Sequence, residues 1–254
     1  AEINNFYTLT VYIKGAELVR MLANLLGPVL FRKGCDQYFD HHDGQAVTTE
    51  AFVSAMEHAS GLDLSQFRLW YEQAGTPKLT ARGTYDAEVA RYTLTVAQQC
   101  PSTPDQDQKK PFHIPLATAL FDRAGQAMKT TIGTQGDPKH EHMLGLCQQE
   151  QQFVFEGVVK EPVVSLLRRF SAPVELESDL SGDELAILMA HDDDPFNRWD
   201  AGQRLFSTEV LRAFEAAVED NSFSLNERFA VAFENTLRHD FDDRSFQAYA
   251  LALP

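Results

Sequence analysis

The stretch Tyr92-Thr93-Leu94-Thr95-Val96-Ala97 decides the fold class, because apolar and polar side chains alternate in it with a period of two. Such alternation predicts a half-buried β-strand. Further strand-like runs follow at 114–121, 153–155 and 172–176, and the first of them ends in the turn-forming sequence Asp122-Arg123-Ala124-Gly125. Several short strands separated by turn signals predict a β-sandwich over residues 77–177. The pattern of residues 126–148 is too weak to assign.

On the N-terminal side, the spacing of apolar residues changes to three and four, which predicts helices for residues 1–76. We expect one helix from Lys14 to the break at Gly27-Pro28, and a second from there to the turn at Asp43-Gly44. A third is expected to begin at Thr48 or Thr49 and to close at Ser60-Gly61.

The sequence Asp63-Leu64-Ser65-Gln66 resembles a capping box, in which the first and fourth side chains satisfy the free N–H groups of a helix start. It predicts a fourth helix with Phe67 and Trp70 facing inward. Gly75-Thr76-Pro77 is expected to end this helix, since glycine suits the position after a helix and proline cannot continue it.

Helical spacing returns after Ser178. Ser181-Gly182-Asp183-Glu184 and Asp194-Pro195 are typical helix starts, the second with proline at the first helical position. We expect the helix after Pro195 to carry an apolar face that includes Leu205, Phe206, Val210 and Phe214, and two more helices at 225–239 and 246–253. The prediction is an α+β multidomain chain with a helical part at 1–76, a β-sandwich at 77–177 and a second helical part at 178–254.

The charge balance limits the classes of partner. Asp and Glu number 37 against 22 Lys and Arg, which gives a net charge of −15, and most of the excess lies in the last segment. A nucleic-acid partner is therefore not expected, because phosphate contacts need clustered basic side chains. A membrane partner is not expected either, since the sequence contains no run of 18 apolar residues. The three cysteines share no metal-binding spacing, which favours a reducing, cytoplasmic location.

Few residues form a pattern that indicates catalysis or metal binding. The sequence contains no H-E-x-x-H, G-x-S-x-G, P-loop or G-x-G-x-x-G motif. Three clusters hold possible metal ligands: His41-His42-Asp43, His140-Glu141-His142 and His191-Asp192-Asp193-Asp194. We expect each to be structural, because the first is a polar helix end, the second lacks a third ligand, and the third combines a helix end with the next helix's N-cap.

Tyr12 stands just before the helix start Lys14-Gly15-Ala16-Glu17. A tyrosine there can present its hydroxyl to a cleft, and with an ordinary pKa of about 10 a phenol is a neutral hydrogen-bond donor at pH 7. Taken alone, the position leaves packing and catalysis both open.

A series of different short motifs extends, in a fixed order, along essentially the whole chain: Tyr12, Lys14-Gly15-Ala16-Glu17, His42-Asp43-Gly44, Trp70-Tyr71, Pro101-Ser102-Thr103-Pro104-Asp105-Gln106, Phe170-Ser171-Ala172-Pro173-Val174 and Arg198-Trp199-Asp200-Ala201. In this combination the chain resembles the aminopeptidase N family of zinc gluzincin peptidases, and its bacterial members most closely. The resemblance implies the helical end of a thermolysin-like catalytic domain, then a β-sandwich, then the start of an α-helical domain.

The resemblance also implies a role for Tyr12, which matches the tyrosine that donates a hydrogen bond to the oxyanion of the tetrahedral intermediate. Ile13 stands where the family usually has glutamate. The family's H-E-x-x-H motif and its glutamate ligand lie N-terminal to the matched region, and the chain starts at Ala1 and stops at Pro254. We therefore expect a fragment of an enzyme, with Tyr12 as its one catalytic residue and with no zinc or other cofactor of its own.

The leading hypothesis is a fragment of a cytoplasmic, zinc-dependent aminopeptidase that cleaves N-terminal amino acids from peptides, the fragment alone being inactive. The alternative is a non-catalytic scaffold or interaction protein. The mass of the native protein, and the presence of H-E-x-x-H in it, would distinguish the two.

Overall fold

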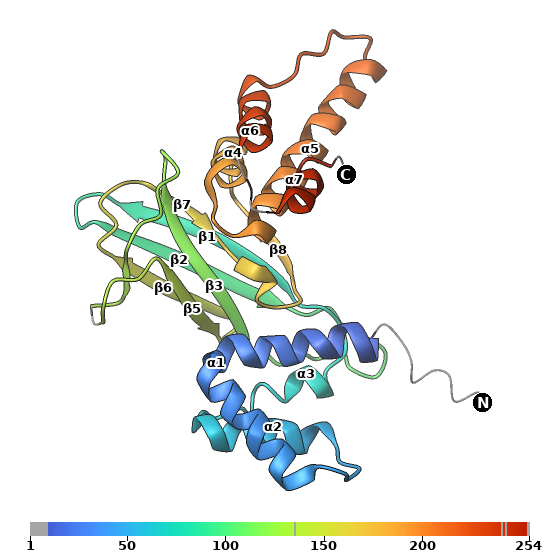
Figure 1. Cartoon of the computed structure of the whole chain (residues 1–254). Coiled ribbons are helices and arrows are strands. Elements are labelled where there is room, and N and C mark those ends of the chain that lie inside the picture. The colour runs from blue at the N-terminus through green and yellow to red at the C-terminus, as the bar shows by residue number, and fades with distance from the viewer. Residues whose placement is uncertain (1–9, 135, 240, 242, 253–254) are drawn as a thin grey trace.

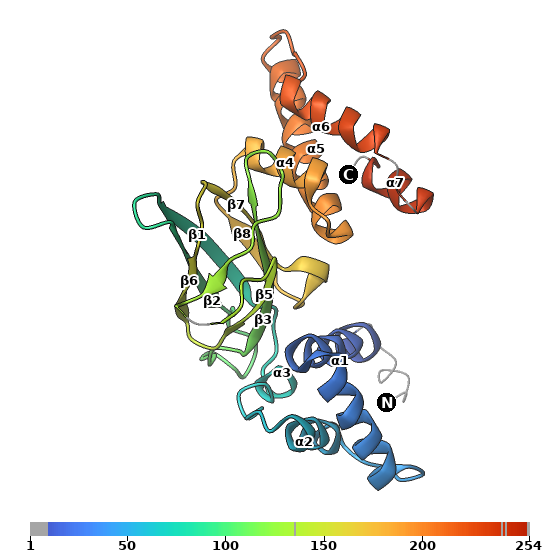
Figure 2. The same cartoon turned by 60° about the vertical axis from the view of Figure 1, so that its left-hand side comes forward.

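The computed structural model describes residues 10–134, 136–239, 241 and 243–252. Helices occupy both ends of the molecule and two β-sheets lie between them (Figure 1). The two helical parts are well separated and each lies against its own end of the β-sheet region (Figures 1 and 2). The order helical, sheet, helical confirms the predicted α+β multidomain class.

The first helical part consists of a π-helical turn (Thr10–Lys14), α1 (Gly15–His42), α2 (Thr49–Ser60) and the single turn α3 (Leu69–Glu72). Inside α1, Gly27 leaves the helical conformation with φ 76° and ψ 164°. The predicted break at Gly27-Pro28 is therefore confirmed as a sharp kink, since only glycine enters this region of φ without strain. Gly61, with φ 70°, closes α2 as predicted.

The capping box predicted at Asp63-Leu64-Ser65-Gln66 is wrong. The Asp63 carboxylate accepts a hydrogen bond from the N–H of Ser65, two residues on, which makes a local turn. The Gln66 amide donates instead to the carbonyls of Pro111 (2.9 Å) and Cys147 (2.7 Å). Its side chain therefore joins this segment to the sheets, and the expected fourth helix shrinks to α3. Phe67 and Trp70 are buried as predicted.

The sheets contain eight strands among the described residues: β1 (Lys78–Asp86), β2 (Arg91–Gln99), β3 (Ile114–Asp122), β4 (Thr131–Ile132), β5 (Glu141–Leu146), β6 (Glu150–Glu156), β7 (Pro162–Ser165) and β8 (Glu175–Ser178). One sheet has the order β4-β6-β2-β1-β8 and the other β5-β3-β7. Neighbours are antiparallel except β1 and β8. The strand expected at 172–176 starts later, at Glu175, and the unassigned stretch 126–148 supplies β4 and β5.

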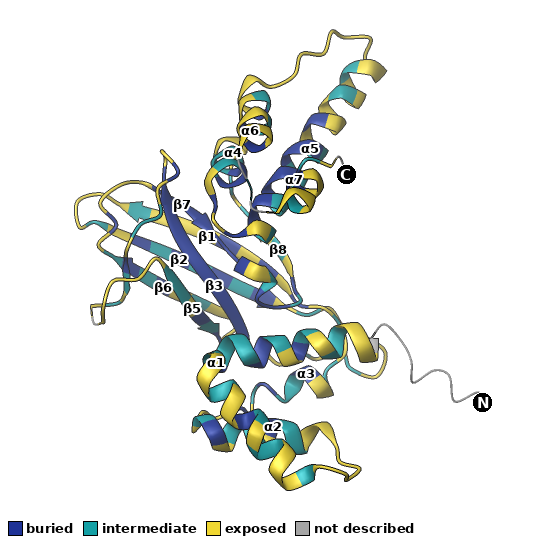
Figure 3. Ribbon diagram, in the orientation of Figure 1, coloured by how far each residue is buried: buried dark blue, intermediate teal, exposed yellow. Residues whose placement is uncertain are grey.

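Strands β2 and β3 show how the sheets are covered. In β2 the side chains of Tyr92, Leu94 and Val96 are buried in alternation, as predicted. Strand β3 is buried at every residue, because its alternate side chains enter two different cores (Figure 3). Leu116 and Leu120 join the core between the sheets and α1, whereas Ala119 and Phe121 pack against the C-terminal helices.

The second helical part contains α4 (Gly182–His191), α5 (Pro195–Val218), α6 (Glu227–Arg238) and α7 (Arg244–Ala250). Ser181 and Glu184 form a capping box, and Asp194 caps α5 by accepting from the N–H of Asn197. Only part of the expected apolar face of α5 is buried. Leu205 and Phe206 are buried, but Val210 and Phe214 are 53% and 66% exposed.

Candidate functional site

Tyr12 lies in the π-helical turn that leads into α1, with 57% of its surface exposed. Its neighbours Val11 and Ile13 are exposed to the same extent, so three large side chains point outward from one turn. Lys14, at the end of this turn, donates from Nζ to the carbonyl of Gly75 at 2.9 Å. π-helical turns are rare and often occur at functional sites. The turn thus presents Tyr12 on the surface, from a segment tied to the end of the first helical part.

Arg20 anchors the first half of α1 to the sheets. Its guanidinium donates to the Glu17 carboxylate and to the backbone carbonyls of Arg169 and Phe170, and it lies 5.5 Å from the centre of the Phe170 ring. Asn24, one turn further along α1, donates to the carbonyl of Ser171. The helix that carries Tyr12 at its start is therefore held along one side by a single loop.

This loop, residues 167–171, has an unusual backbone. Leu167, Arg169 and Phe170 have φ of 54°, 55° and 50°, in the left-handed region that non-glycine residues rarely adopt. Such residues cost free energy and persist only where the surroundings hold them. Ser171 provides one restraint, because its hydroxyl donates to the carbonyl of Pro115 (2.9 Å) and accepts from the N–H of Ala117 (3.1 Å).

Arg168 provides the other restraint, because its buried guanidinium lies at the centre of an ionic network. Its guanidinium pairs with Asp192, Asp193 and Glu141. Asp192 also accepts from the Ser165 hydroxyl at 2.6 Å. Burial opposes the charge of Arg168, but the three carboxylates outweigh it and raise the pKa of the guanidinium. The loop is therefore bonded to α1 through its backbone carbonyls, which accept hydrogen bonds, and to the end of α4 through the ion pairs of Arg168.

Two of the three clusters of possible metal ligands have structural roles. Asp192 belongs to the Arg168 network and Asp194 caps α5, as expected for a helix end followed by an N-cap. Glu141 pairs with Arg168 and Arg169, and His142 is bonded to the Thr130 hydroxyl. Within the described residues, no three His, Cys, Asp or Glu side chains come together as a group that could hold a metal ion. The residues present therefore do not fit a catalytic zinc.

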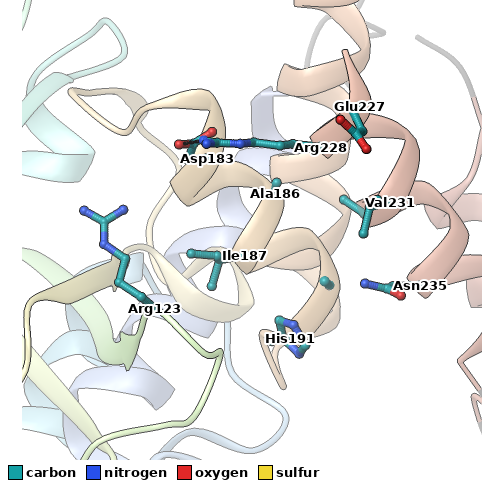
Figure 4. A pocket seen from close by; sticks show the side chains of 11 residues that line it. Arg123, Asp183, Ala186, Ile187, His191, Glu227, Arg228, Val231 and Asn235 are labelled. Carbon is teal, nitrogen blue, oxygen red and sulfur yellow. Dashed lines mark ion pairs between the residues drawn. The ribbon is translucent and has the colours of Figure 1, made fainter. Parts of the chain in front are cut away.

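A hollow of about 450 Å³ lies between α4 and α6 (Figure 4). Ile187 and Val231 supply apolar surface, while Asp183 and Arg228 form an ion pair at its rim. The side chains that line it include His191 but no serine, threonine or cysteine. We assign it no reaction.

Arg20 and Arg168 are the positioning residues that sequence reasoning missed. The available signal was the pair Arg168-Arg169 directly after a strand-like apolar run, together with an acidic triplet at 192–194. Nothing in the spacing connects them, because Arg168 and Asp192 are 24 positions apart and Arg20 and Phe170 are 150 apart.

Comparison with protein families divides the chain in the order seen in the fold. Residues 1–71 match the peptidase family M1 domain. Residues 75–179 match a domain of unknown function with an Ig-like fold, and residues 182–254 match one with ARM repeats. These descriptions agree with the predicted succession of helical part, β-sandwich and helical part. No helix in the described part of the chain combines the length and apolarity needed to cross a membrane.

Similar proteins match along the whole chain. Aminopeptidase N of Escherichia coli (strain K12) is 46% identical over 253 residues, which are 100% of this chain and 29% of that protein. Aminopeptidase N of Caulobacter vibrioides is 42% identical, over 28% of its length. The crystal structure of Legionella pneumophila aminopeptidase A in complex with aspartic acid superposes with a TM-score of 0.80 at 26% identity, covering 100% of this chain and 27% of that one. The chain thus spans less than a third of each of these relatives, and it is homologous along its whole length to bacterial aminopeptidase N, with a peptidase family M1 segment at its start.

Proposed function

We propose that this chain is part of a metalloaminopeptidase that removes N-terminal amino acids from peptides. The observation that carries the proposal is the full-length match to aminopeptidase N at 42–46% identity. The three cysteines, none of them in a disulfide, support a cytoplasmic location for the enzyme, because thiols stay reduced there.

Within this enzyme we assign Tyr12 to transition-state stabilisation. The exposed position of Tyr12 supports the assignment, since a donor must reach the substrate from the surface of its own segment. Its phenolic O–H would donate to the oxyanion that forms when the scissile carbonyl becomes tetrahedral. A donor of this kind, held in place before the reaction, contributes about 3 kcal/mol to the transition state.

The anchoring of α1 supports the same assignment. A donor stabilises the transition state only if its position is fixed beforehand, because otherwise ordering it costs free energy during the reaction. Lys14, bonded to Gly75, and Arg20, bonded to the loop at 167–171, hold the turn that carries Tyr12 and the helix α1 that follows it. The zinc of the enzyme would be bound by residues other than those described here.

The test uses the longer protein that carries this chain, with the substitution Tyr12→Phe. The ring and its packing stay, and one hydroxyl is lost. We expect kcat to fall about a hundredfold or more with a smaller change in KM, because the hydrogen bond is made chiefly to the transition state.

Tyr71→Phe is the matched control. Tyr71 lies in the same helical part, is 38% exposed and packs edge-on against Phe67. We expect its kcat to stay within about twofold of the unaltered enzyme, and both variants to keep the melting temperature, since loss of an exposed hydroxyl changes stability little. An unchanged kcat in Tyr12→Phe would contradict the assignment.

The alternative, a scaffold without catalysis, is favoured by one observation: the second half of α5 exposes Val210, Leu211, Phe214 and Val218, a face that a partner could cover. Peptide hydrolysis by the longer protein distinguishes the two functions. The aminopeptidase proposal predicts release of N-terminal residues that a metal chelator abolishes, and the scaffold predicts none.

A further inference from the structure

A second cavity lies where the end of α4, the first turns of α5 and the segment before α7 meet. Its volume is about 580 Å³, within the usual range for sites that bind small molecules. The α5 and α7 helices lie side by side at this place (Figure 1). The lining combines one arginine, Arg198, with three aspartates, two histidines and the rings of Phe241 and Phe246.

Arg198 is buried beside this cavity. Only 7% of the residue is exposed. Its guanidinium donates from one terminal nitrogen to the carbonyl of Ala190 at 3.2 Å and lies 4.5 Å from the centre of the Phe241 ring. Its Nε is buried and has no hydrogen-bond partner. Among the described residues no carboxylate forms an ion pair with it, whereas Arg168 has three.

An unpaired, buried guanidinium points to a missing ligand. Burial lowers the pKa of Arg198, and the nearby charge of Asp192 only partly offsets this. The carboxylate of Asp192 already accepts hydrogen bonds from Arg168, from the Ser165 hydroxyl and from the N–H of Asp194. Buried donors in folded proteins are almost always satisfied, so an orphaned one at a cavity wall needs a partner. A carboxylate suits it best, because a planar guanidinium and a carboxylate can form two parallel hydrogen bonds.

The same cavity also carries negative charge, which a simple anion would meet unfavourably. Asp243 caps α7 with one oxygen, Oδ1, which accepts from the N–H groups of Ser245 and Phe246. Its second oxygen has no bond to any described residue. The rings of Phe241 and Phe246 meet edge-on at 5.4 Å and form an apolar wall. The cavity therefore offers a cation, an anion and an apolar surface together.

We propose that this cavity binds a free α-amino acid as its zwitterion. The α-carboxylate pairs with Arg198, the α-ammonium group pairs with Asp243, and an apolar side chain lies against Phe241 and Phe246. Neither a metal ion nor a simple anion matches all three features: the cavity has no group of three metal ligands among the described residues, and an anion would leave Asp243 facing a like charge.

The first experiment is calorimetric titration of the 254-residue chain with L-leucine. The two comparison compounds are leucinamide, which lacks the carboxylate, and 4-methylpentanoate, which lacks the ammonium group. We expect leucine to bind and each comparison compound to bind at least tenfold more weakly. Absence of leucine binding at about 10 mM would overturn the proposal. So would equal binding of either comparison compound, because the site would then not recognise a zwitterion.

The second experiment uses Asp243→Asn, because asparagine caps a helix as well as aspartate and the fold is retained. We expect at least tenfold weaker leucine binding at an unchanged melting temperature. Arg198→Gln should abolish binding, provided the melt of the variant shows a folded chain. Arg228→Gln, in the hollow of Figure 4, is the matched control and should bind leucine normally. Unchanged binding in Asp243→Asn, or equal loss in Arg228→Gln, would contradict the proposal. The measurement involves no peptide hydrolysis, so its outcome is independent of the proposed function.

Discussion

The guanidinium of Arg168 and the carboxylate of Asp192 meet at 2.7 Å with only 4% and 0% of their side chains exposed. Arg168 follows strand β7, and Asp192 ends helix α4, so the pair joins the sheets to the C-terminal helices. The loop that carries Arg168 also holds Arg20 of α1 through its carbonyls. One buried residue therefore contributes to the relative placement of all three parts.

We expect Asp192→Asn to lower the free energy of unfolding by about 3 kcal/mol, because the substitution leaves a buried guanidinium short of one of its charges. Asp36→Asn is the control: Asp36 pairs with Arg32 on the surface, with side chains 54% and 79% exposed, and should change stability by less than about 0.5 kcal/mol. Denaturant unfolding measures both. Similar losses in the two variants would show that the buried pair has no special weight.

Gly34→Ala should destabilise the first helical part. A methyl group at Gly34 would lie 2.4 Å from Sδ and 3.2 Å from Cα of Met56, so the buried Met56 side chain would have to move and α1 and α2 to shift slightly apart. Overpacking of this kind costs about 1–3 kcal/mol. Gly15→Ala, where a methyl group meets nothing within 4 Å, should be neutral or stabilising. Thermal melts of the two variants compare them directly, and a neutral Gly34→Ala would mean that the two helices can move apart freely.

His113 should contribute to acid sensitivity. Burial lowers the pKa of this imidazole from its ordinary value of 6.5. As the pH falls through 6.5, the unfolded chain takes up a proton there before the folded chain does, so the free energy of unfolding decreases. In His113→Asn this contribution is absent, and the loss of stability between about pH 7.5 and pH 5.5 should be smaller. His58→Asn, at an exposed position, should leave the loss unchanged. Parallel pH profiles for all three proteins would contradict the prediction.

The domain boundaries remain a prediction, and residues 77–177 alone should test them. We expect a β-type circular dichroism spectrum and a sigmoidal melt, at a lower temperature than that of the whole chain. The decrease follows from lost partners: the Trp70 ring packs at a tilt against Phe112 and its indole N–H donates to the carbonyl of His113, and Phe121 packs against the C-terminal helices. A spectrum of a disordered chain would show that the sheets do not fold alone.

Local patterns predicted the elements whose formation depends on near neighbours. The kink at Gly27, the end of α2 at Gly61 and the start of α5 at Asp194-Pro195 follow from glycine's access to positive φ, from proline's missing N–H and from a capping carboxylate. Each of these effects acts within a few residues, so the sequence is sufficient. The alternation in β2 was equally informative, because one face of that strand is buried.

Other features depended on contacts between distant residues. Gln66 sits in a capping-box pattern but bonds to Pro111 and Cys147, and Val210 and Phe214 continue the apolar face of α5 without being covered. The strained loop at 167–171 forms because Ser171 and Arg168 find partners elsewhere in the fold.

The sequence by itself determined the class of most elements, the order of the three parts and the resemblance that singled out Tyr12. Only the tertiary structure decided that Arg168 lies among three carboxylates and that Arg198, beside a cavity, forms no ion pair with a carboxylate among the described residues. The physical reason is the separation along the chain of the residues that interact. Helix starts, kinks and alternation arise from interactions a few residues apart, whereas the burial and pairing of a charge depend on side chains brought together from many positions along the chain.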